Sequence, residues 1–267
     1  MDITRLFSLE GRIALVTGGS RGIGRMIAEG FLAAGVARVY ITARKVAELE
    51  ATAAELGERC IALPGDIGDM AGIEALAADL AAREERLDIL VNNAGVAWSA
   101  PFDSFPELGW DKVMDLNLKA PFYLTQKLHP LLRAGASADR PAKVIMIASV
   151  DGMKLNPWET YPYQASKAGL IHLTRRMAAH LAGEHIAVTA ISPGMFASKM
   201  NRAAAMAGDK LTAQIPIGRV GVDEDMAGAA IYLASRAGDY VVGETLVVDG
   251  GWVNAWIPKD FVGPGGE

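Results

Sequence analysis

Short apolar runs alternate with longer helical patterns along almost the whole chain, and this alternation constrains the fold more than any other feature. The runs are rich in valine and isoleucine and mostly lack polar alternation, which is typical of strands buried on both faces of a parallel sheet. The alanine-rich segments between them are long enough to cross over to the next parallel strand. The pattern predicts an α/β fold with a doubly wound parallel sheet of about seven strands and helices on both faces. The expected strands are 12–17, 38–42, 60–63, 87–91, 143–148, 187–191 and 245–249, and the expected helices include 24–34, 46–56 and 70–83.

Chain length and charge narrow the class of protein further. The 267 residues are 51% hydrophobic, and no Pro/Ser-rich linker or internal repeat divides them. We therefore expect one domain over residues 1–267, with a loose tail at about 258–267. The net charge of −5 gives no reason to expect nucleic acid or a membrane as a partner. Cys60 is the single cysteine, and no signal peptide or long apolar span is present, so we expect a cytoplasmic protein.

A glycine-rich stretch, Thr17-Gly-Gly-Ser-Arg-Gly-Ile-Gly24, stands between the first expected strand and the first expected helix. Glycines allow a tight turn and a close approach of the backbone to a pyrophosphate, which then lies against the helix N-terminus. A position between strand and helix is the context that a dinucleotide site requires. The stretch predicts a Rossmann-type cofactor site formed by Gly18, Ser20, Arg21, Gly22, Ile23 and Gly24.

The end of the second expected strand distinguishes between the two nicotinamide cofactors. A dinucleotide fold that binds NAD has an acidic residue there, about 20 residues beyond the last glycine, for the ribose 2′-hydroxyl. In this chain Ala43 occupies that place, and Arg44 follows it. A guanidinium can bind a 2′-phosphate with paired hydrogen bonds, whereas a carboxylate would repel it. Because Arg21 can approach the same phosphate from the glycine loop, we predict NADP(H) as the cofactor.

Further motifs resemble one known family over nearly the whole chain. The glycine loop matches the T-G-x-x-x-G-I-G signature of the short-chain dehydrogenases/reductases. The other matching motifs are Asn92-Asn-Ala-Gly95, Asn117, Ser149, Tyr163-x-x-x-Lys167 and Pro193-Gly194. Within this family the pattern looks most like the 3-oxoacyl-carrier-protein reductases, particularly the rhamnolipid-biosynthesis type, through residues 183–186 and 193–200.

The resemblance implies further cofactor contacts outside the glycine loop. Asp66 and Ile67 match the segment that receives the adenine, with Asp66 accepting from its amino group. The turn after the sixth expected strand passes beside the nicotinamide in relatives. Relatives more often have isoleucine and threonine where this chain has Phe196 and Ser198. The implied contacts are Asp66, Ile67, Asn92, Ala94, Gly95, Tyr163, Lys167, Pro193, Gly194, Phe196 and Ser198.

A tyrosine and a lysine one helical turn apart carry the predicted chemistry. Tyr163 and Lys167 share a helix face, and an ammonium beside a phenol favours the phenolate, so we expect a lowered tyrosine pKa. Ser149 directly follows a strand, where its hydroxyl can stabilise a developing alkoxide. The family resemblance adds Asn117 as the residue that holds a water in the proton relay. The predicted catalytic residues are therefore Asn117, Ser149, Tyr163 and Lys167.

Together these features predict an NADP(H)-dependent oxidoreductase that reduces a carbonyl to a secondary alcohol. The loops expected around the substrate contribute Trp98, Met153, Leu155, Trp158, Tyr161 and Met206. Such an apolar pocket suits a 3-oxoacyl thioester or another apolar ketone. We also expect residues 199–217 to form a mobile lid. Two alternatives stay open at this point: oxidation of an alcohol or sugar with NAD(P), and a catalytically silent nucleotide-binding regulator.

Partners follow from the resemblance and from one departure from it. The acyl group could arrive on acyl-carrier protein or coenzyme A. However, Pro130 and Ala179 stand where carrier-binding reductases have arginines, which leaves the carrier open. Relatives are usually tetramers, so we expect a homotetramer, with Trp252 and Trp256 suited to subunit contacts. The four histidines have no metal-ligand spacing, and no metal is expected.

Overall fold

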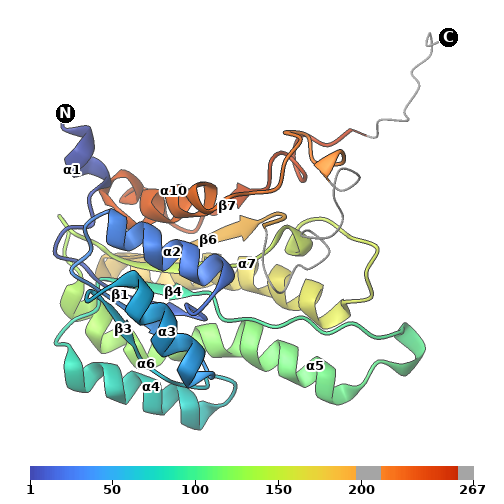
Figure 1. Ribbon diagram of the computed structural model, residues 1–267, viewed down its shortest axis with the longest axis horizontal. Coiled ribbons are helices and arrows are strands. Elements are labelled where there is room, and N and C mark those ends of the chain that lie inside the picture. The colour runs from blue at the N-terminus through green and yellow to red at the C-terminus, as the bar shows by residue number, and fades with distance from the viewer. Residues whose placement is uncertain (197–211, 258–267) are drawn as a thin grey trace.

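The computed structural model describes residues 1–196 and 212–257, and the tail expected at 258–267 and most of the expected lid lie outside them. Seven parallel strands form one sheet in the order β3-β2-β1-β4-β5-β6-β7 (Figure 1), which confirms the doubly wound fold. The strands are β1 (Ile13–Thr17), β2 (Arg38–Thr42), β3 (Cys60–Ala62), β4 (Ile89–Asn92), β5 (Ala142–Ile147), β6 (Ile186–Pro193) and β7 (Thr245–Val248).

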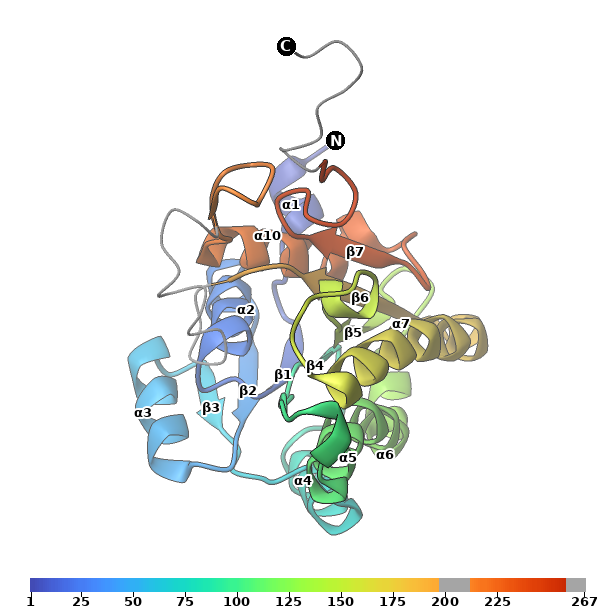
Figure 2. The same ribbon diagram turned by 90° about the vertical axis from the view of Figure 1, so that its right-hand side faces the viewer.

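Helices cover both faces of the sheet (Figure 2). One face carries α2 (Gly22–Ala33), α3 (Val46–Leu56) and α10 (Asp223–Ala234), and the other carries α4 (Met70–Arg83), α6 (Ala120–Gly135) and α7 (Tyr161–Leu181). The short α1 (Ile3–Phe7) precedes β1, and α5 (Glu107–Met114) precedes α6. Single turns complete the described chain: η1 (Phe102–Ser104), the π-helical η2 (Asp115–Lys119), η3 (Val150–Gly152), η4 (Ala182–Glu184) and η5 (Arg236–Gly238).

Two hydrophobic cores flank the sheet and explain why its strands are apolar throughout. Every residue of β1, β4, β5 and β6 is buried, because helices cover both faces of these strands. Phe31 of α2 is fully buried in the core on one face, and Leu128 of α6 is fully buried on the other. Burial of this kind leaves the strand ends as the places where polar side chains can be exposed to a ligand.

The carboxyl ends of the strands meet at one edge of the sheet. The chain order reverses between β1 and β4, and such a switch point leaves a crevice for ligands at that edge. The glycine loop follows β1, Asn93 follows β4, Ser149 lies just beyond β5, and Pro193 ends β6. Residues far apart in the sequence are brought together there.

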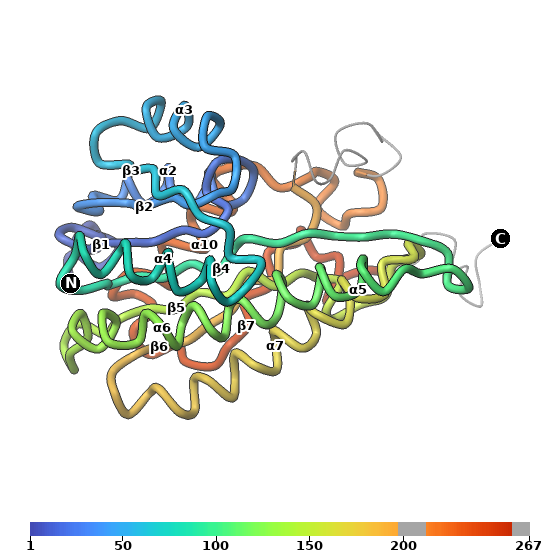
Figure 3. The backbone as a smooth tube through the Cα atoms, turned by 90° about the horizontal axis from the view of Figure 1, so that it is seen from below, coloured from blue at the N-terminus to red at the C-terminus, as the bar shows by residue number. Residues whose placement is uncertain are grey.

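A long segment extends beyond this edge of the sheet. After β4 the chain runs outward through η1 before it returns in α5, which packs against α7 (Figure 3). The first residue of α7, Tyr161, meets this segment because its ring makes edge-to-face contacts with Phe102 and Phe105 at 5.6 and 5.8 Å. The extension therefore forms one end of the molecule, beside the ligand crevice. No helix of the described residues is long and apolar enough to cross a membrane.

Candidate active site

A cavity of about 770 Å³ lies at the carboxyl edge of the sheet, within the size range of small-molecule and cofactor sites. It continues from the glycine loop after β1, past the end of β4, to the start of α7. Most of the residues predicted to bind cofactor or substrate line it: Gly18, Ser20, Arg21, Gly22, Ile23, Arg44, Asp66, Ile67, Ala94, Gly95, Ser149, Tyr163, Lys167, Pro193, Gly194 and Phe196. Gly24, Asn92 and Asn117 are not part of its wall, and Ser198 lies outside the described residues.

The glycine loop turns tightly against the segment after β4. Gly18 has a φ of +65°, and a Cβ there would lie 2.9 Å from the side-chain nitrogen of Asn93. Gly24 does not face the cavity, but a Cβ there would lie 2.3 Å from the carbonyl oxygen of Gly18, so glycine lets α2 begin directly behind the loop. No side chain caps the start of α2, which leaves its first N–H groups available to an anion. The loop therefore fits a pyrophosphate.

Two arginines lie at the end of the cavity that is expected to hold the adenosine. The Arg21 guanidinium is 3.3 Å from the Glu48 carboxylate, and that of Arg44 is 3.9 Å from the Asp66 carboxylate. Their side chains are 50% and 59% exposed, so neither guanidinium is fixed by burial. Both can turn toward a 2′-phosphate. Glu48 lines the same part of the cavity and was not foreseen from the sequence.

The segment after β4 differs from the expectation by one residue. Asn92 is buried, and its amide donates to Oγ1 of Thr125, a residue of α6, at 3.2 Å. Asn93 lines the cavity instead, and its amide donates to the carbonyl oxygens of Thr17 at 2.7 Å and Gly18 at 3.2 Å. The neighbour of the predicted residue thus holds the glycine loop in place.

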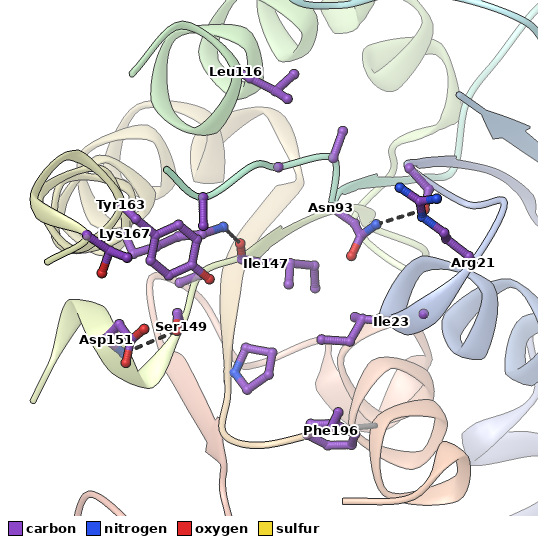
Figure 4. A pocket seen from close by; sticks show the side chains of 18 of the residues that line it. Arg21, Ile23, Asn93, Leu116, Ile147, Ser149, Asp151, Tyr163, Lys167 and Phe196 are labelled. Atoms are coloured by element: carbon purple, nitrogen blue, oxygen red, sulfur yellow. Dashed lines mark hydrogen bonds between the residues drawn. The ribbon is translucent and has the colours of Figure 1, made fainter. Parts of the chain in front are cut away.

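Ser149, Tyr163 and Lys167 meet at the other end of the cavity (Figure 4). The Lys167 ammonium donates to the carbonyl oxygen of Ile147 at 2.7 Å, and it lies 5.6 Å from the centre of the Tyr163 ring. The Ser149 hydroxyl lies close enough to the Tyr163 phenol to act on its pKa. The helix α7 therefore supplies the tyrosine and the lysine, and the end of β5 supplies the serine.

The pKa of Tyr163 is raised in this structure, against the lowering expected from Lys167. Burial raises the pKa of Tyr163 to about 12, against the opposite effect of the Ser149 hydrogen bond, and the charge of Asp151 raises it further. Burial also lowers the pKa of Lys167 to about 8, which Asp151 opposes. Because desolvation outweighs the effect of Ser149, Tyr163 keeps its proton at neutral pH.

Comparison with known proteins places this geometry in a family. The family model described as enoyl-(acyl carrier protein) reductase matches residues 18–253. The rhamnolipids biosynthesis 3-oxoacyl-[acyl-carrier-protein] reductase of Pseudomonas aeruginosa is 50% identical over 251 residues, covering 92% of this chain and 98% of its own. The chain belongs to the short-chain dehydrogenase/reductase family. As a member of this family, it is an oxidoreductase.

Solved structures of other short-chain dehydrogenases/reductases share the fold closely. The Pseudomonas aeruginosa RhlG/NADP active-site complex has a TM-score of 0.89 at 49% identity and covers 93% of this chain and 98% of that chain. A gluconate 5-dehydrogenase from Burkholderia cenocepacia, in complex with NADP and tartrate, has a TM-score of 0.85 at 35% identity. It covers 94% of this chain and 98% of that chain. Relatives named for acyl thioesters and for sugar acids thus share one architecture.

In this short-chain dehydrogenase/reductase, Asn117 lies in the π-helical η2 and is not part of the cavity wall. Its side-chain oxygen accepts from Val96 N at 2.9 Å, and its amide donates to Val96 O at 2.9 Å and to Ser166 Oγ at 3.2 Å. The side chain therefore ties the segment after β4 to α7. A role for Asn117 in holding a water stays a prediction.

The expected apolar substrate wall is only partly present among the described residues. Trp158 lines the cavity, whereas Trp98 packs on Gly109 of α5, and Leu155 is 84% exposed. Trp252, expected at a subunit contact, lines the cavity instead. Met153 and Tyr161 are not part of its wall, and Met206 lies outside the described residues.

Proposed function

We propose that this enzyme reduces the ketone of a 3-oxoacyl thioester, or of another neutral apolar substrate, to a secondary alcohol with NADPH. The observation that carries the proposal is the continuity of the cavity. It joins two exposed guanidinium groups, Arg21 and Arg44, to the Ser149–Tyr163–Lys167 cluster. The two relatives of known structure described above have NADP in their complexes, which supports the same cofactor here.

The described residues fit a bound dinucleotide along the whole cavity. The glycine loop and the uncapped start of α2 would receive the pyrophosphate, and Arg44 with Arg21 would receive the 2′-phosphate. Gly194 borders the nicotinamide end, where a Cβ would lie 2.7 Å from the backbone of Asp249. Glycine at position 194 therefore lets the turn after β6 pack directly on the Asp249 backbone, and Pro193, Gly194 and Phe196 line the cavity there.

NADPH, when bound, supplies the hydride that forms the new C–H bond at the carbonyl carbon. The carbonyl oxygen gains negative charge as its double bond opens, and Ser149 is placed to stabilise it by a hydrogen bond. Tyr163 carries a proton at neutral pH and donates it to that oxygen, which completes the alcohol. Lys167, held by the Ile147 carbonyl, places an ammonium beside the phenolate that remains.

Initial rates test this function directly. We expect NADPH-dependent loss of a 3-oxobutanoyl thioester, faster than with NADH, and formation of the 3-hydroxy product, with simple ketones and diketones as comparison substrates. Rates confined to polyol or sugar-acid oxidation with NAD⁺ would contradict the proposal. Tight NADPH binding without turnover of any ketone would instead favour the catalytically silent regulator. We also propose that the acyl group is carried on acyl-carrier protein or coenzyme A. A cytoplasmic location is part of the same proposal.

We further propose that the enzyme is a homotetramer. The extension and α5 leave large apolar side chains uncovered, including Phe102 at 73% and Leu108 at 72% exposed. Trp110 of α5 and Phe122 of α6 are also exposed, and burial of such side chains favours association. Light scattering at micromolar concentration should give about four times the chain mass of 28.2 kDa. A monomer mass would contradict the proposal.

A further inference from the structure

An acidic side chain, Asp151, shares the cavity with the catalytic cluster, and none of the chemistry described so far uses it. It lies in η3, two residues after Ser149, and its backbone N–H donates to Ser149 Oγ at 3.1 Å. Figure 4 places it beyond Ser149, on the side opposite Asn93 and Arg21. Asp151 therefore lines the cavity on the side away from the part that fits the adenosine and pyrophosphate.

The turn that carries Asp151 is fixed against the catalytic helix. A Cβ at Gly152 would lie 2.7 Å from the carbonyl carbon of Lys167, so η3 is pressed directly onto the backbone of α7. On the following residues, Lys154 N donates to Val150 O at 2.8 Å, and Lys154 Nζ donates to Trp252 O at 2.9 Å. These contacts hold the turn that carries Asp151 in a fixed position beside the catalytic cluster.

No cation among the described residues lies within ion-pairing distance of the Asp151 carboxylate. The nearby Lys154 ammonium instead lies over the rings of Trp252 and Trp256, at 4.8 and 4.1 Å from their centres. Lys167 attracts the carboxylate, and the Asn156 amide is beside it, but burial still raises the pKa of Asp151 above its usual value. The charge is thus weakly compensated, and a second carboxylate in this space would be repelled.

We propose that Asp151 is a specificity-determining residue, which excludes substrates with a carboxylate near the reacting carbonyl and so favours neutral esters, thioesters and ketones. The inference rests on the proposed reductase function and defines its substrate class. Exclusion by a repelling charge is a common source of specificity. It matters in this fold because a relative named for a sugar acid, with tartrate in its structure, has the same architecture.

Two small ketones of nearly the same shape test this inference. Acetoacetamide is neutral at pH 7 and acetoacetate is an anion, so the ratio of their kcat/KM values with NADPH isolates charge. We expect the wild type to prefer the amide at least tenfold. Asp151→Asn should reduce this ratio by about tenfold, equivalent to about 1.4 kcal/mol, through a higher kcat/KM for acetoacetate. Asp151→Ser provides a second variant should the amide side chain disturb folding.

The matched control removes a carboxylate outside the cavity. Asp103→Asn makes the same charge change at an exposed position in η1, close to Tyr161, and should leave the ratio unchanged. An unchanged ratio in both Asp151 variants would overturn the inference, as would a wild type that reduces both ketones equally well.

A binding measurement separates this inference from the reductase proposal. Trp158 and Trp252 line the cavity, so their fluorescence can report occupancy of the enzyme–NADP⁺ complex. If neither these ketones nor the 3-oxobutanoyl thioester is reduced by any variant, the proposed function fails. The inference still requires that Asp151→Asn binds acetoacetate about tenfold more tightly while acetoacetamide affinity changes much less. Equal changes in affinity for both ketones would overturn it.

Discussion

Replacement of Tyr163 by phenylalanine is expected to lower kcat for ketone reduction by about a thousandfold or more. In the proposed mechanism the Tyr163 phenol, which lines the cavity with Ser149, donates the proton, and positioned general acids contribute about 10²- to 10⁴-fold to rate. The phenylalanine ring keeps the shape of the residue, so the cavity and the cofactor site should persist. Stopped-flow hydride transfer with NADPH and a 3-oxoacyl thioester measures the loss at the chemical step.

The neighbouring tyrosine provides the matched control. Tyr161 lies two residues earlier on α7, outside the cavity wall, with its hydroxyl donating to the Glu159 carboxylate at 3.1 Å. Tyr161→Phe should therefore keep kcat within a few-fold of wild type. NADPH affinity measured by fluorescence should be little changed in both variants. Near-normal turnover of Tyr163→Phe would remove this tyrosine from the mechanism and leave Ser149 and Lys167 without a proton donor.

The fold could be predicted closely because burial on both sides of a sheet gives the strongest sequence signal. The bounds expected for β2, α3 and α4 agree with those observed. The sixth strand was predicted too short, because it continues through Ser192 to Pro193. Polar and proline residues look like a loop in a sequence, yet here they are the last residues of a buried strand that leads directly into the cavity.

Side-chain direction was harder to predict than element position. Successive residues of a strand point to opposite faces, so an error of one residue exchanges the two asparagines at the end of the fourth strand. Asn92 ends β4 and its side chain donates to Thr125 of α6, whereas the side chain of Asn93 donates to the glycine loop. The alternation of side chains along the strand indicates which asparagine faces the cavity, but only when the end of the strand is known to within one residue.

The electrostatic balance of the site could not be obtained from the motif alone. A tyrosine and a lysine one turn apart predict a phenolate if the charge of the lysine dominates. In the folded protein the lysine ammonium is committed to the Ile147 carbonyl, and burial raises the pKa of the phenol. Asp151 adds a negative charge from a different element, and only the packing of η3 on α7 brings it there.

Substitution of Arg44 by aspartate is expected to change the cofactor preference by about a hundredfold or more, measured as the ratio of kcat/KM for NADPH to that for NADH. Arg44 follows β2 and lies beside Asp66, with its guanidinium 3.9 Å from that carboxylate and open to the cavity. A guanidinium binds a phosphate through charge-assisted hydrogen bonds, whereas a carboxylate repels the 2′-phosphate. The aspartate can also accept a hydrogen bond from the ribose 2′-hydroxyl of NADH. We therefore expect kcat/KM for NADPH to fall and kcat/KM for NADH to rise.

A second arginine distinguishes a specific contact from a general effect of charge. Arg25 of α2 pairs with Glu55 at 2.7 Å and does not line the cavity, so Arg25→Asp makes the same charge change away from the cofactor site. It should leave the cofactor ratio within about threefold of wild type. Arg21→Ala should have a smaller effect than Arg44→Asp. Arg21 already pairs with Glu48, and alanine adds no carboxylate that would repel the 2′-phosphate. Equal ratios for the wild type and Arg44→Asp would mean that the 2′-phosphate is recognised elsewhere, and the case for NADPH would then depend on the relatives alone.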